Sequence, residues 1–359
     1  MRLVFVTQAL DAEHPVLAQT LDLVRALAER SEELVVLCLT REGDPELPSN
    51  VRVRVFGGGS RLGRGARFLG ALALELGRRP RPDALLVHMV PLLLVLAAPF
   101  AKLRGVRLLL WYTHWHAGRT LRAATTLADT VLSVDRRSFP LDSPKVRGIG
   151  HAVDIERFSP APTPSSGGRL RLLALGRTAR WKGYDTMLAA LERALAAGVD
   201  AELELRGPQL TPDERSHARE LQHRITTSEL LRERVMLEPP LARAELPALL
   251  AGVDGLLSAT QPRGSETLDK VVYEAAACGV PVLASNAALE KFLGALPLRL
   301  SFPPRDDQEL AARIIALAAA SPHVRRATGA ELRRRVVAGH SLATWADAVA
   351  EAVSGVPPE

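Results

Sequence analysis

Cysteine is almost absent from this chain of 359 residues, which contains only Cys38 and Cys278. Two cysteines cannot build a disulfide framework or a cysteine-rich zinc site, and their scarcity is typical of proteins of the reducing cytosol. Aromatic residues make up only 4% of the chain, so few side chains could stack on bases. No nucleic-acid-binding motif is present either. We therefore expect neither a disulfide-rich secreted protein nor a nucleic-acid partner.

The sequence also lacks a clear signal for export or for membrane insertion. Residues 1–6 are too short and too strand-like for a signal peptide, and no small-residue cleavage site follows them. Residues 84–101 carry no formal charge, but Pro91 and Pro99 interrupt them. A buried strand followed by a buried helix is the favoured interpretation, with a peripheral membrane contact as the alternative. We expect a cytoplasmic protein, and attachment to the inner face of the membrane stays open.

Positive charge is concentrated in the first part of the chain. Residues 1–155 contain 21 Lys or Arg and 15 Asp or Glu, whereas residues 156–359 contain 25 of each. Six arginines between positions 61 and 81 are accompanied by a single acid, Glu75. A solvated basic surface is the ordinary explanation. The functional alternative is a face for an anionic acceptor or for anionic lipid headgroups.

Short apolar segments alternate with amphipathic ones along most of the chain, which predicts parallel βαβ units. A stretch rich in Pro, Ser and Gly at 160–169 interrupts this alternation, which then restarts. The length also favours two domains. We predict an α/β protein with two doubly wound, Rossmann-like domains facing each other across a cleft. They cover residues 1–155 and 169–338, with a linker at 156–168 and a C-terminal helix at 339–359. That helix either packs back on the first domain or belongs to an ordinary core.

Two junctions between a loop and a helix in the second domain suit an anionic ligand. In ALGRTARWKGYDT, Gly176 permits a tight turn, and Arg177 and Lys182 flank the loop before a helix. Two cations beside a helix N-terminus favour a diphosphate. Lys182 is one of only five lysines, against 41 arginines. A basic surface loop is the alternative explanation.

The second junction is QPRGSETLDKVVYEAAACGVPV, in which Glu266 and Glu274 are eight residues apart. Thr267 or Asp269 could cap the following helix, and Lys270 would lie in its first turn, where a bound anion would favour a cation. Eight helical residues span about 12 Å, which is long for a glycosidase carboxylate pair. We expect two separate contacts along one extended ligand.

The first domain offers histidines as candidates. His114 and His116 follow an apolar strand, and two-residue spacing on a strand would direct both to one side. No further metal ligand lies near them in sequence, so we expect no metal site. One of the two should line the cleft. No GxGxxG sequence is present, so dinucleotide binding is not indicated.

Taken together, these segments resemble retaining glycosyltransferases of family 4, which have the GT-B fold. LGRTARWKGYDTMLAAL is similar to the strand, loop and helix that carry the family's GR and KG residues. ETLDKVVYEAAACGVPVLAS is similar to its E-x7-E motif, with Glu266 and Glu274 as the two acids. GIGHAVDIERF is similar to the join between its domains. The resemblance is strong over 170–290 and weak in the first half.

The resemblance implies a cytoplasmic transferase that needs no metal or other cofactor and takes a sugar from a nucleoside-diphosphate sugar. Arg177 and Lys182 would hold the diphosphate, Glu274 the ribose, and Glu266 the donor sugar. His114 would act at the reacting centre, with His116 in reserve. The acceptor is unknown, and an anionic or membrane-associated one is the hypothesis.

Two departures from the family pattern affect these expectations. Thr267, Leu268 and Asp269 replace the usual Gly-Phe-Gly, so that side chains could reshape the sugar pocket, and Lys270 could offset the charge of Asp269. His14 stands where the family has a glycine-rich loop on the acceptor side, which makes His14 an acceptor-side candidate together with His116. The alternatives are another GT-B activity, an epimerase or phosphorylase, and a non-catalytic protein that binds sugar nucleotides.

Overall fold

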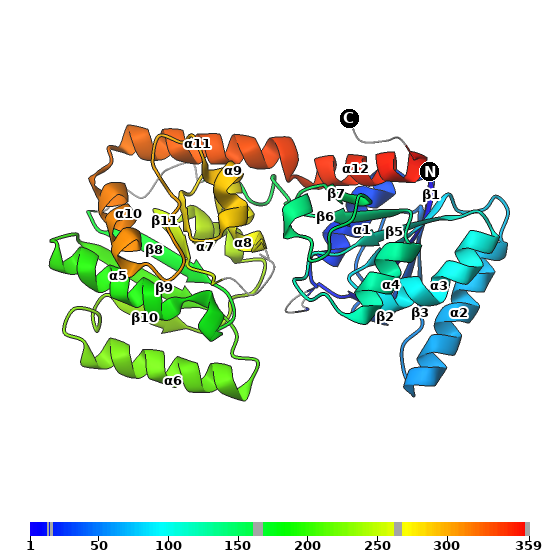
Figure 1. Cartoon of the computed structure of the whole chain (residues 1–359), viewed down its shortest axis with the longest axis horizontal. Coiled ribbons are helices and arrows are strands. Elements are labelled where there is room, and N and C mark those ends of the chain that lie inside the picture. The colour runs from blue at the N-terminus through cyan, green and yellow to red at the C-terminus, as the bar shows by residue number, and fades with distance from the viewer. Residues whose placement is uncertain (13, 15–16, 161–167, 262–267, 356–359) are drawn as a thin grey trace. The chain divides into compact units, whose positions relative to one another are not determined.

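The computed structural model describes residues 1–12, 14, 17–160, 168–261 and 268–355. The chain forms two units with separate cores (Figure 1). The first unit combines Met1–Ala152 with Gly339–Glu359, and the second is Val153–Ala338. Each unit is a parallel sheet with helices packed on it, as expected for βαβ repeats.

The first unit contains a seven-stranded sheet in the order β3-β2-β1-β4-β5-β6-β7. Its strands are β1 (Arg2–Leu10), β2 (Glu33–Arg41), β3 (Val51–Val55), β4 (Ala84–His88), β5 (Arg107–Trp111), β6 (Thr130–Ser133) and β7 (Val146–Gly148). Its helices are α1 (Thr20–Glu29), α2 (Arg61–Gly77), α3 (Pro91–Leu103), α4 (Arg119–Leu127), the 3-10 turn η1 (Arg136–Ser138) and α12 (Leu342–Ser354). The central strands are apolar along their length because helices cover both faces.

The C-terminal helix α12 completes the core of this first unit. Trp345 is fully buried, and its ring meets that of Trp111 edge to face, with the centroids 5.7 Å apart. Ala346, Val349 and Val353 are buried on the same helix. Such burial removes a large apolar area from water, so α12 is part of the unit's core.

The second unit contains a five-stranded sheet in the order β10-β9-β8-β11-β12. Its strands are β8 (Leu170–Leu175), β9 (Ala201–Arg206), β10 (Val235–Glu238), β11 (Gly255–Ser258) and β12 (Val282–Ala284). Its helices are η2 (Arg180–Lys182), α5 (Tyr184–Ala196), α6 (Pro212–Thr227), α7 (Leu246–Ala251), α8 (Lys270–Ala277), η3 (Ala287–Leu289), α9 (Glu290–Leu293), α10 (Asp307–Ala319) and α11 (Pro322–Gly339).

The strand order of the second unit fixes where a ligand can enter. The chain goes from β8 outward through β9 to β10, and then returns to the other side of β8 to form β11. The connections leaving β8 and β11 therefore diverge at the carboxyl ends of two neighbouring strands. Open parallel sheets bind ligands at such a switch point.

The apolar segment at 84–101 forms a strand and a helix, as predicted, but the helix is buried on one face only. All five residues of β4 are buried. Only Leu94, Ala97, Ala98 and Ala101 are buried in α3, because the helix packs on the sheet with one face only. Within the described part of the chain, no helix has the length and apolar character needed to cross a membrane.

Candidate functional site

At the switch point of the second unit, a glycine lies where the loop after β8 contacts the loop after β11. Gly183 lies between η2 and α5 with φ +73°, in the left-handed region that favours glycine. A Cβ on Gly183 would come within 2.2 Å of the carbonyl oxygen of Ala259, which follows β11. The absence of a side chain thus lets the loop after β8 pack directly on the loop after β11.

Lys182, which the sequence assigned to a diphosphate, lies at this junction beside Asp269. Its Nζ is 2.6 Å from Oδ1 of Asp269, and both side chains are largely buried, with 10% and 16% exposed. The hydroxyl of Thr260 donates to Oδ2 of the same carboxylate at 2.8 Å. Nζ of Lys182 also lies 4.6 Å from the centre of the Trp181 ring. The structure therefore places a fixed, nearly desolvated charge pair between the two loops.

Asp269 has a different role from the helix cap that was considered for it. It occupies the N-cap position of α8, but its side chain makes no capping hydrogen bond because it is used by Lys182 and Thr260. Lys270 begins the helix, so it lies in the first turn as predicted. Leu268 is buried. Glu266 and Thr267 lie outside the described residues.

Arg177 is held by a carboxylate that the sequence reasoning missed. Nη2 of Arg177 lies 2.5 Å from Oε1 of Glu214, whose side chain is almost fully buried. The backbone N–H of Leu210 donates to Oε2 of Glu214 at 2.6 Å. Glu214 and Thr211 also form a capping box at the start of α6. The TPDE sequence signals that cap, but it does not reveal the ion pair with a residue 37 positions away.

A cavity of about 430 Å³ opens beside Arg177. It is lined by residues from the loop after β8, from the start of α6 and from the loop after β11: Arg177, Ala179, Arg180, Trp181, Thr211, Asp213, Glu214 and Gln261. Three of these side chains are cationic or aromatic and two are acidic. The cavity thus lies at the carboxyl ends of the strands, where ligands bind in this class of sheet.

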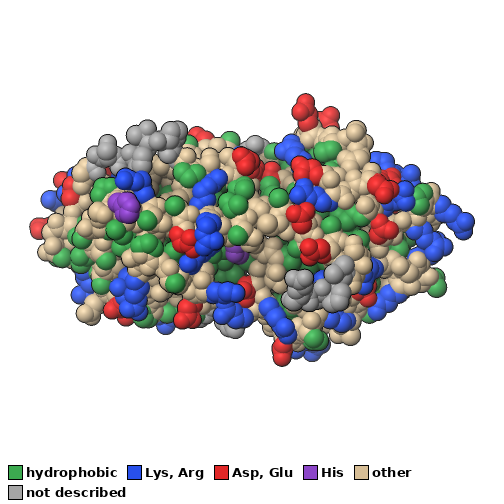
Figure 2. All heavy atoms as spheres, turned by 90° about the horizontal axis from the view of Figure 1, so that it is seen from above, with side chains coloured by type: hydrophobic (Ala, Val, Ile, Leu, Met, Phe, Trp, Pro, Cys, Tyr) green, Lys and Arg blue, Asp and Glu red, His purple; other side chains and the backbone are tan. Residues whose placement is uncertain are grey.

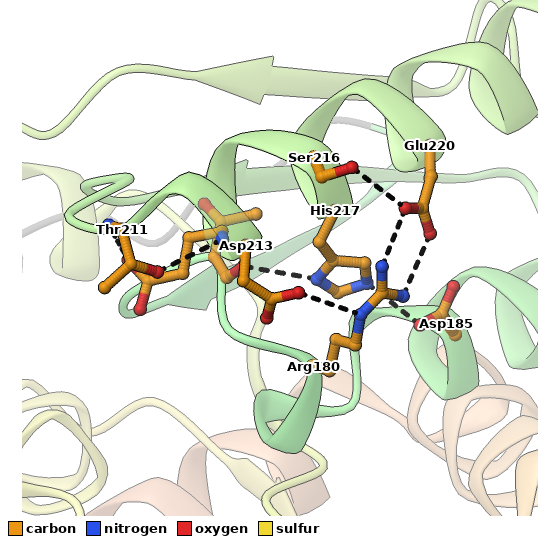
Figure 3. Close-up of polar contacts among 9 residues, drawn as sticks. Arg180, Asp185, Thr211, Asp213, Ser216, His217 and Glu220 are labelled. Atoms are coloured by element: carbon orange, nitrogen blue, oxygen red, sulfur yellow. Dashed lines mark hydrogen bonds and ion pairs between the residues drawn. The ribbon is translucent and has the colours of Figure 1, made fainter.

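A polar network behind the loop after β8 connects it to α5 and α6 (Figure 3). Arg180 donates to both carboxylate oxygens of Glu220, at 2.7 and 2.9 Å. Nδ1 of His217 lies 3.2 Å from the carbonyl oxygen of Thr178, and Nε2 lies 3.0 Å from a carboxylate oxygen of Asp185. Both partners of the imidazole are acceptors, so the charged ring with two N–H groups satisfies them best.

The contact between His217 and Asp185 shifts both groups in the directions expected for an ion pair. The hydrogen bond to Asp185 raises the pKa of His217. The same bond lowers the pKa of Asp185. His217 is fully buried, so it fixes the Thr178 carbonyl and with it the course of the loop that carries Arg177. No sequence motif indicated this residue.

Glu274, the acid that the resemblance assigns to the ribose, is buried on α8. Its Oε1 lies 3.3 Å from Nη1 of Arg243, a residue that follows β10. The guanidinium of Arg243 lies 5.7 Å from the centre of the Phe158 ring. Sequence reasoning missed Arg243, because nothing local marks an arginine in the loop after β10 as the partner of an acid 31 residues later.

His114 and His116 do not lie on a strand, contrary to the expectation from the sequence. β5 ends at Trp111, and His114 and His116 are exposed in the loop that follows. The backbone N–H of His116 donates to Nδ1 of His114 at 3.2 Å, so the two positions belong to one tight turn and the alternation argument fails. Nδ1 of His14 accepts a hydrogen bond from the N–H of Leu17 at 2.9 Å. Across the described ranges, no three His, Cys, Asp or Glu residues are grouped to hold a metal ion.

Comparison with known proteins places these features in a wider context. Residues 169–320 match the family model for glycosyl transferases group 1. Solved structures align over almost the whole chain. HepE from Anabaena in complex with UDP-glucose covers 99% of this chain and 100% of its own, with a TM-score of 0.73 and 19% identity. Sucrose-phosphate synthase from Thermosynechococcus elongatus covers 99% of both chains, with a TM-score of 0.71 and 18% identity.

The chain has the GT-B fold. Two curated glycosyltransferases match over shorter stretches of the chain. D-inositol 3-phosphate glycosyltransferase 1 from Catenulispora acidiphila is 31% identical over 39% of the chain and 35% of its own length. A GDP-mannose-dependent alpha-(1-6)-phosphatidylinositol monomannoside mannosyltransferase from Mycolicibacterium smegmatis is 28% identical over 54% of the chain and 56% of its own length. The chain thus spans about a third to a half of these relatives. Over the matched stretches the chain is similar in sequence to glycosyltransferases.

Proposed function

We propose that this GT-B protein is a retaining glycosyltransferase that moves a sugar from a nucleoside-diphosphate sugar to an acceptor without a divalent metal. The observation that carries the proposal is the junction of Lys182 with the start of α8 at the switch point of the second sheet. A cation and a helix N-terminus meet there in a largely desolvated position. Such a position suits a diphosphate leaving group.

Under this proposal, Arg177 and Lys182 stabilise the negative charge that develops on the departing diphosphate. Fixed cations of this kind act without reorganising as the bond breaks. The helices α5 and α8 carry no side-chain cap at their N-termini, so their first N–H groups suit anion binding. The absence of a side chain at Gly176 leaves room for Lys182, since a Cβ there would come within 3.2 Å of Cε of Lys182.

The remaining roles follow from the resemblance. Glu274 binds the ribose hydroxyls, and its contact with Arg243 holds the carboxylate in place. Glu266 binds hydroxyls of the donor sugar, and Thr267 to Lys270 shape that pocket. His114, with His116 as the reserve, acts at the reacting centre from the first unit.

An anionic acceptor is part of the proposal. The names of both curated relatives include a phosphorylated inositol. The net positive charge of residues 1–155 favours an acceptor of the same kind. His14, whose Nδ1 accepts a hydrogen bond from the N–H of Leu17, and His116 are the acceptor-side candidates in this unit.

The first test is a thermal-shift panel with UDP, GDP, ADP, TDP, CDP and NAD. A ligand at 100 times its dissociation constant stabilises the folded state by about 2.7 kcal/mol, which corresponds to a shift of a few degrees. We expect one nucleoside diphosphate to shift the transition and NAD to leave it unchanged. Glu274→Ala should weaken this binding, whereas Lys182→Ala should mainly lower turnover. Unchanged binding and turnover in both variants would overturn the site assignment.

A second candidate function is binding of a sugar nucleotide without transfer, which the pairing of Asp269 with Lys182 favours because it neutralises the cation in the unliganded protein. Turnover separates the candidates. A transferase releases nucleoside diphosphate in an acceptor-dependent way and keeps the anomeric configuration of the sugar, which NMR of the product reports. An epimerase acts on the donor alone, and a binding protein releases nothing.

A further inference from the structure

Helices α2 and α3 of the first unit expose an unusual number of apolar side chains. Among the described residues, eleven large hydrophobic side chains are exposed, and five of them lie on α2 or α3. Leu62 at the start of α2 is 89% exposed, and Leu103 at the end of α3 is 83% exposed. The two helices pack side by side. Apolar side chains that gather in this way on a surface mark an interaction site.

On α3 the exposed apolar residues form one continuous face. Leu92, Leu96, Phe100 and Leu103 recur at spacings of four, four and three, and each is exposed or half-buried. The opposite face is buried on the sheet through Leu94, Ala97, Ala98 and Ala101. The helix is therefore apolar on both sides, and packing within the unit explains only one of them.

Helix α2, which packs beside α3, also exposes apolar side chains. Leu74 is exposed on it, and from residue 68 to residue 77 the helix carries a single charge, Glu75. That carboxylate is buried and turned inward, where Nε of Arg54 lies 2.6 Å from it and Nη2 of Arg52 lies 3.3 Å away. Glu75 therefore adds no negative charge to the outer face.

Positive charge surrounds the apolar side chains. Residues 56–106 contain eight Lys or Arg and only two acids, Glu75 and Asp83. In the part of the chain that the structure describes, Arg61, Arg64, Arg79 and Lys102 have no carboxylate partner. On the right of Figure 2, the side on which Figure 1 draws α2 and α3, Lys and Arg side chains lie at the surface with hydrophobic and some acidic ones between them.

We propose that this α2–α3 face, formed by Leu62, Leu74, Leu92, Leu96, Phe100 and Leu103 with the basic residues around them, docks on the surface of an anionic lipid bilayer. A bilayer surface offers an apolar layer beneath negatively charged headgroups, which matches both features of the face. A second copy of the chain would bring the same positive charge to the interface, and like charges disfavour that pairing. The inference does not depend on the chemistry proposed for the second unit.

The experiment measures co-flotation of the full chain with two kinds of vesicle. One kind contains phosphatidylcholine alone, and the other contains phosphatidylcholine and phosphatidylglycerol in equal amounts. We expect binding to the anionic vesicles that falls as salt rises, and little binding to the neutral ones. Failure to bind anionic vesicles at low salt would overturn the proposal.

Two variants test the two components separately. In the apolar variant, Leu62→Ser and Leu103→Ser replace side chains that are almost fully exposed, so folding should be unaffected. We expect its partitioning to fall by at least about tenfold. In the charge variant, Gln replaces Arg61, Arg79 and Lys102. Each replacement should lower partitioning about fivefold, so the three together should lower it about hundredfold.

A matched control makes the same change of charge in the second unit. Arg219, Arg232 and Arg326 are exposed there. Their replacement by Gln should leave partitioning within about twofold, because charge lost far from the α2–α3 face should lower membrane binding less than the same charge lost on that face. An equal loss in the control would overturn the proposal. Light scattering on the same samples supplies the other decisive outcome. Dimers that the apolar variant abolishes, together with no vesicle binding, would assign the face to contacts between copies of the chain.

Discussion

Replacing Asp269 with Asn should weaken the folded protein and strengthen its binding of a nucleoside diphosphate. The carboxylate pairs with Lys182 at 2.6 Å, and both groups are nearly buried. Removing one partner of a buried ion pair leaves the other charge uncompensated, which costs about 3 kcal/mol of stability. The same change removes a negative charge from the position where the diphosphate is proposed to bind.

The size of the affinity gain follows from the geometry of the pair. A phosphate oxygen hydrogen-bonded to Nζ of Lys182, at about 2.8 Å, would lie within about 5 Å of the Asp269 carboxylate. At that separation and an effective dielectric constant of 20 to 80, one unit charge contributes about 1–3 kcal/mol. We therefore expect the dissociation constant of the nucleoside diphosphate to fall by about 5- to 150-fold.

Titration calorimetry with the nucleotide selected by the thermal-shift panel measures this change, and urea unfolding measures stability. Asp200→Asn is the matched control, because Asp200 lies just before β9, at the amino ends of the strands, and pairs with Arg169 and Arg234. It should not alter nucleotide affinity. Equal or weaker binding by the Asp269→Asn variant would refute the reasoning, since Asp269 would then position Lys182 for the ligand and not compete with it.

Three further predictions concern the same unit. Glu274→Gln should raise the dissociation constant of the nucleotide by about tenfold, measured by calorimetry, while Glu202→Gln on β9 should not change it. Gly183→Ala should lower the free energy of unfolding by about 1–3 kcal/mol, because the residue is left-handed and faces backbone, whereas Gly198→Ala, with an equally positive φ but open space around it, should cost less. The hydrogen bond to Asp185 raises the pKa of His217. The stability that the charged imidazole contributes should therefore be complete below about pH 6.5, and it should disappear as the pH rises through the folded-state pKa of His217. Urea unfolding between pH 6 and 9 should therefore show that wild type and His217→Gln converge at high pH, and a constant difference would contradict the assignment.

The fold was largely predictable because its strands are unusually uniform. A strand buried on both faces needs apolar residues along its whole length, so ALLVH stands out from the helices around it. The predictions that were wrong concern the surface, namely the burial of α3 and the position of His114 and His116. Nothing in the pattern of 91–103 shows that half of an apolar helix is left uncovered, since a buried helix and an exposed apolar one have similar compositions.

The candidate site was predictable only where a residue and its surroundings are close in sequence. Lys182 and Lys270 stand beside helix starts, and helix starts have local signals. The partners that define the site electrostatically do not. Glu214 and Arg243 reach their partners across 37 and 31 residues, and Asp269 reaches Lys182 across 87. Such contacts depend on strand order, which a reading of local patterns does not provide.

The position of α12 in the first unit has a consequence for how the protein is made. Residues 1–152 leave the ribosome before the second unit, but the helix that buries Trp111 and packs on α1 is synthesised after that unit. Everything needed for the second unit is contiguous and emerges before that helix. Domains generally fold as units during synthesis, so the first unit begins to be translated before the second but is completed after it.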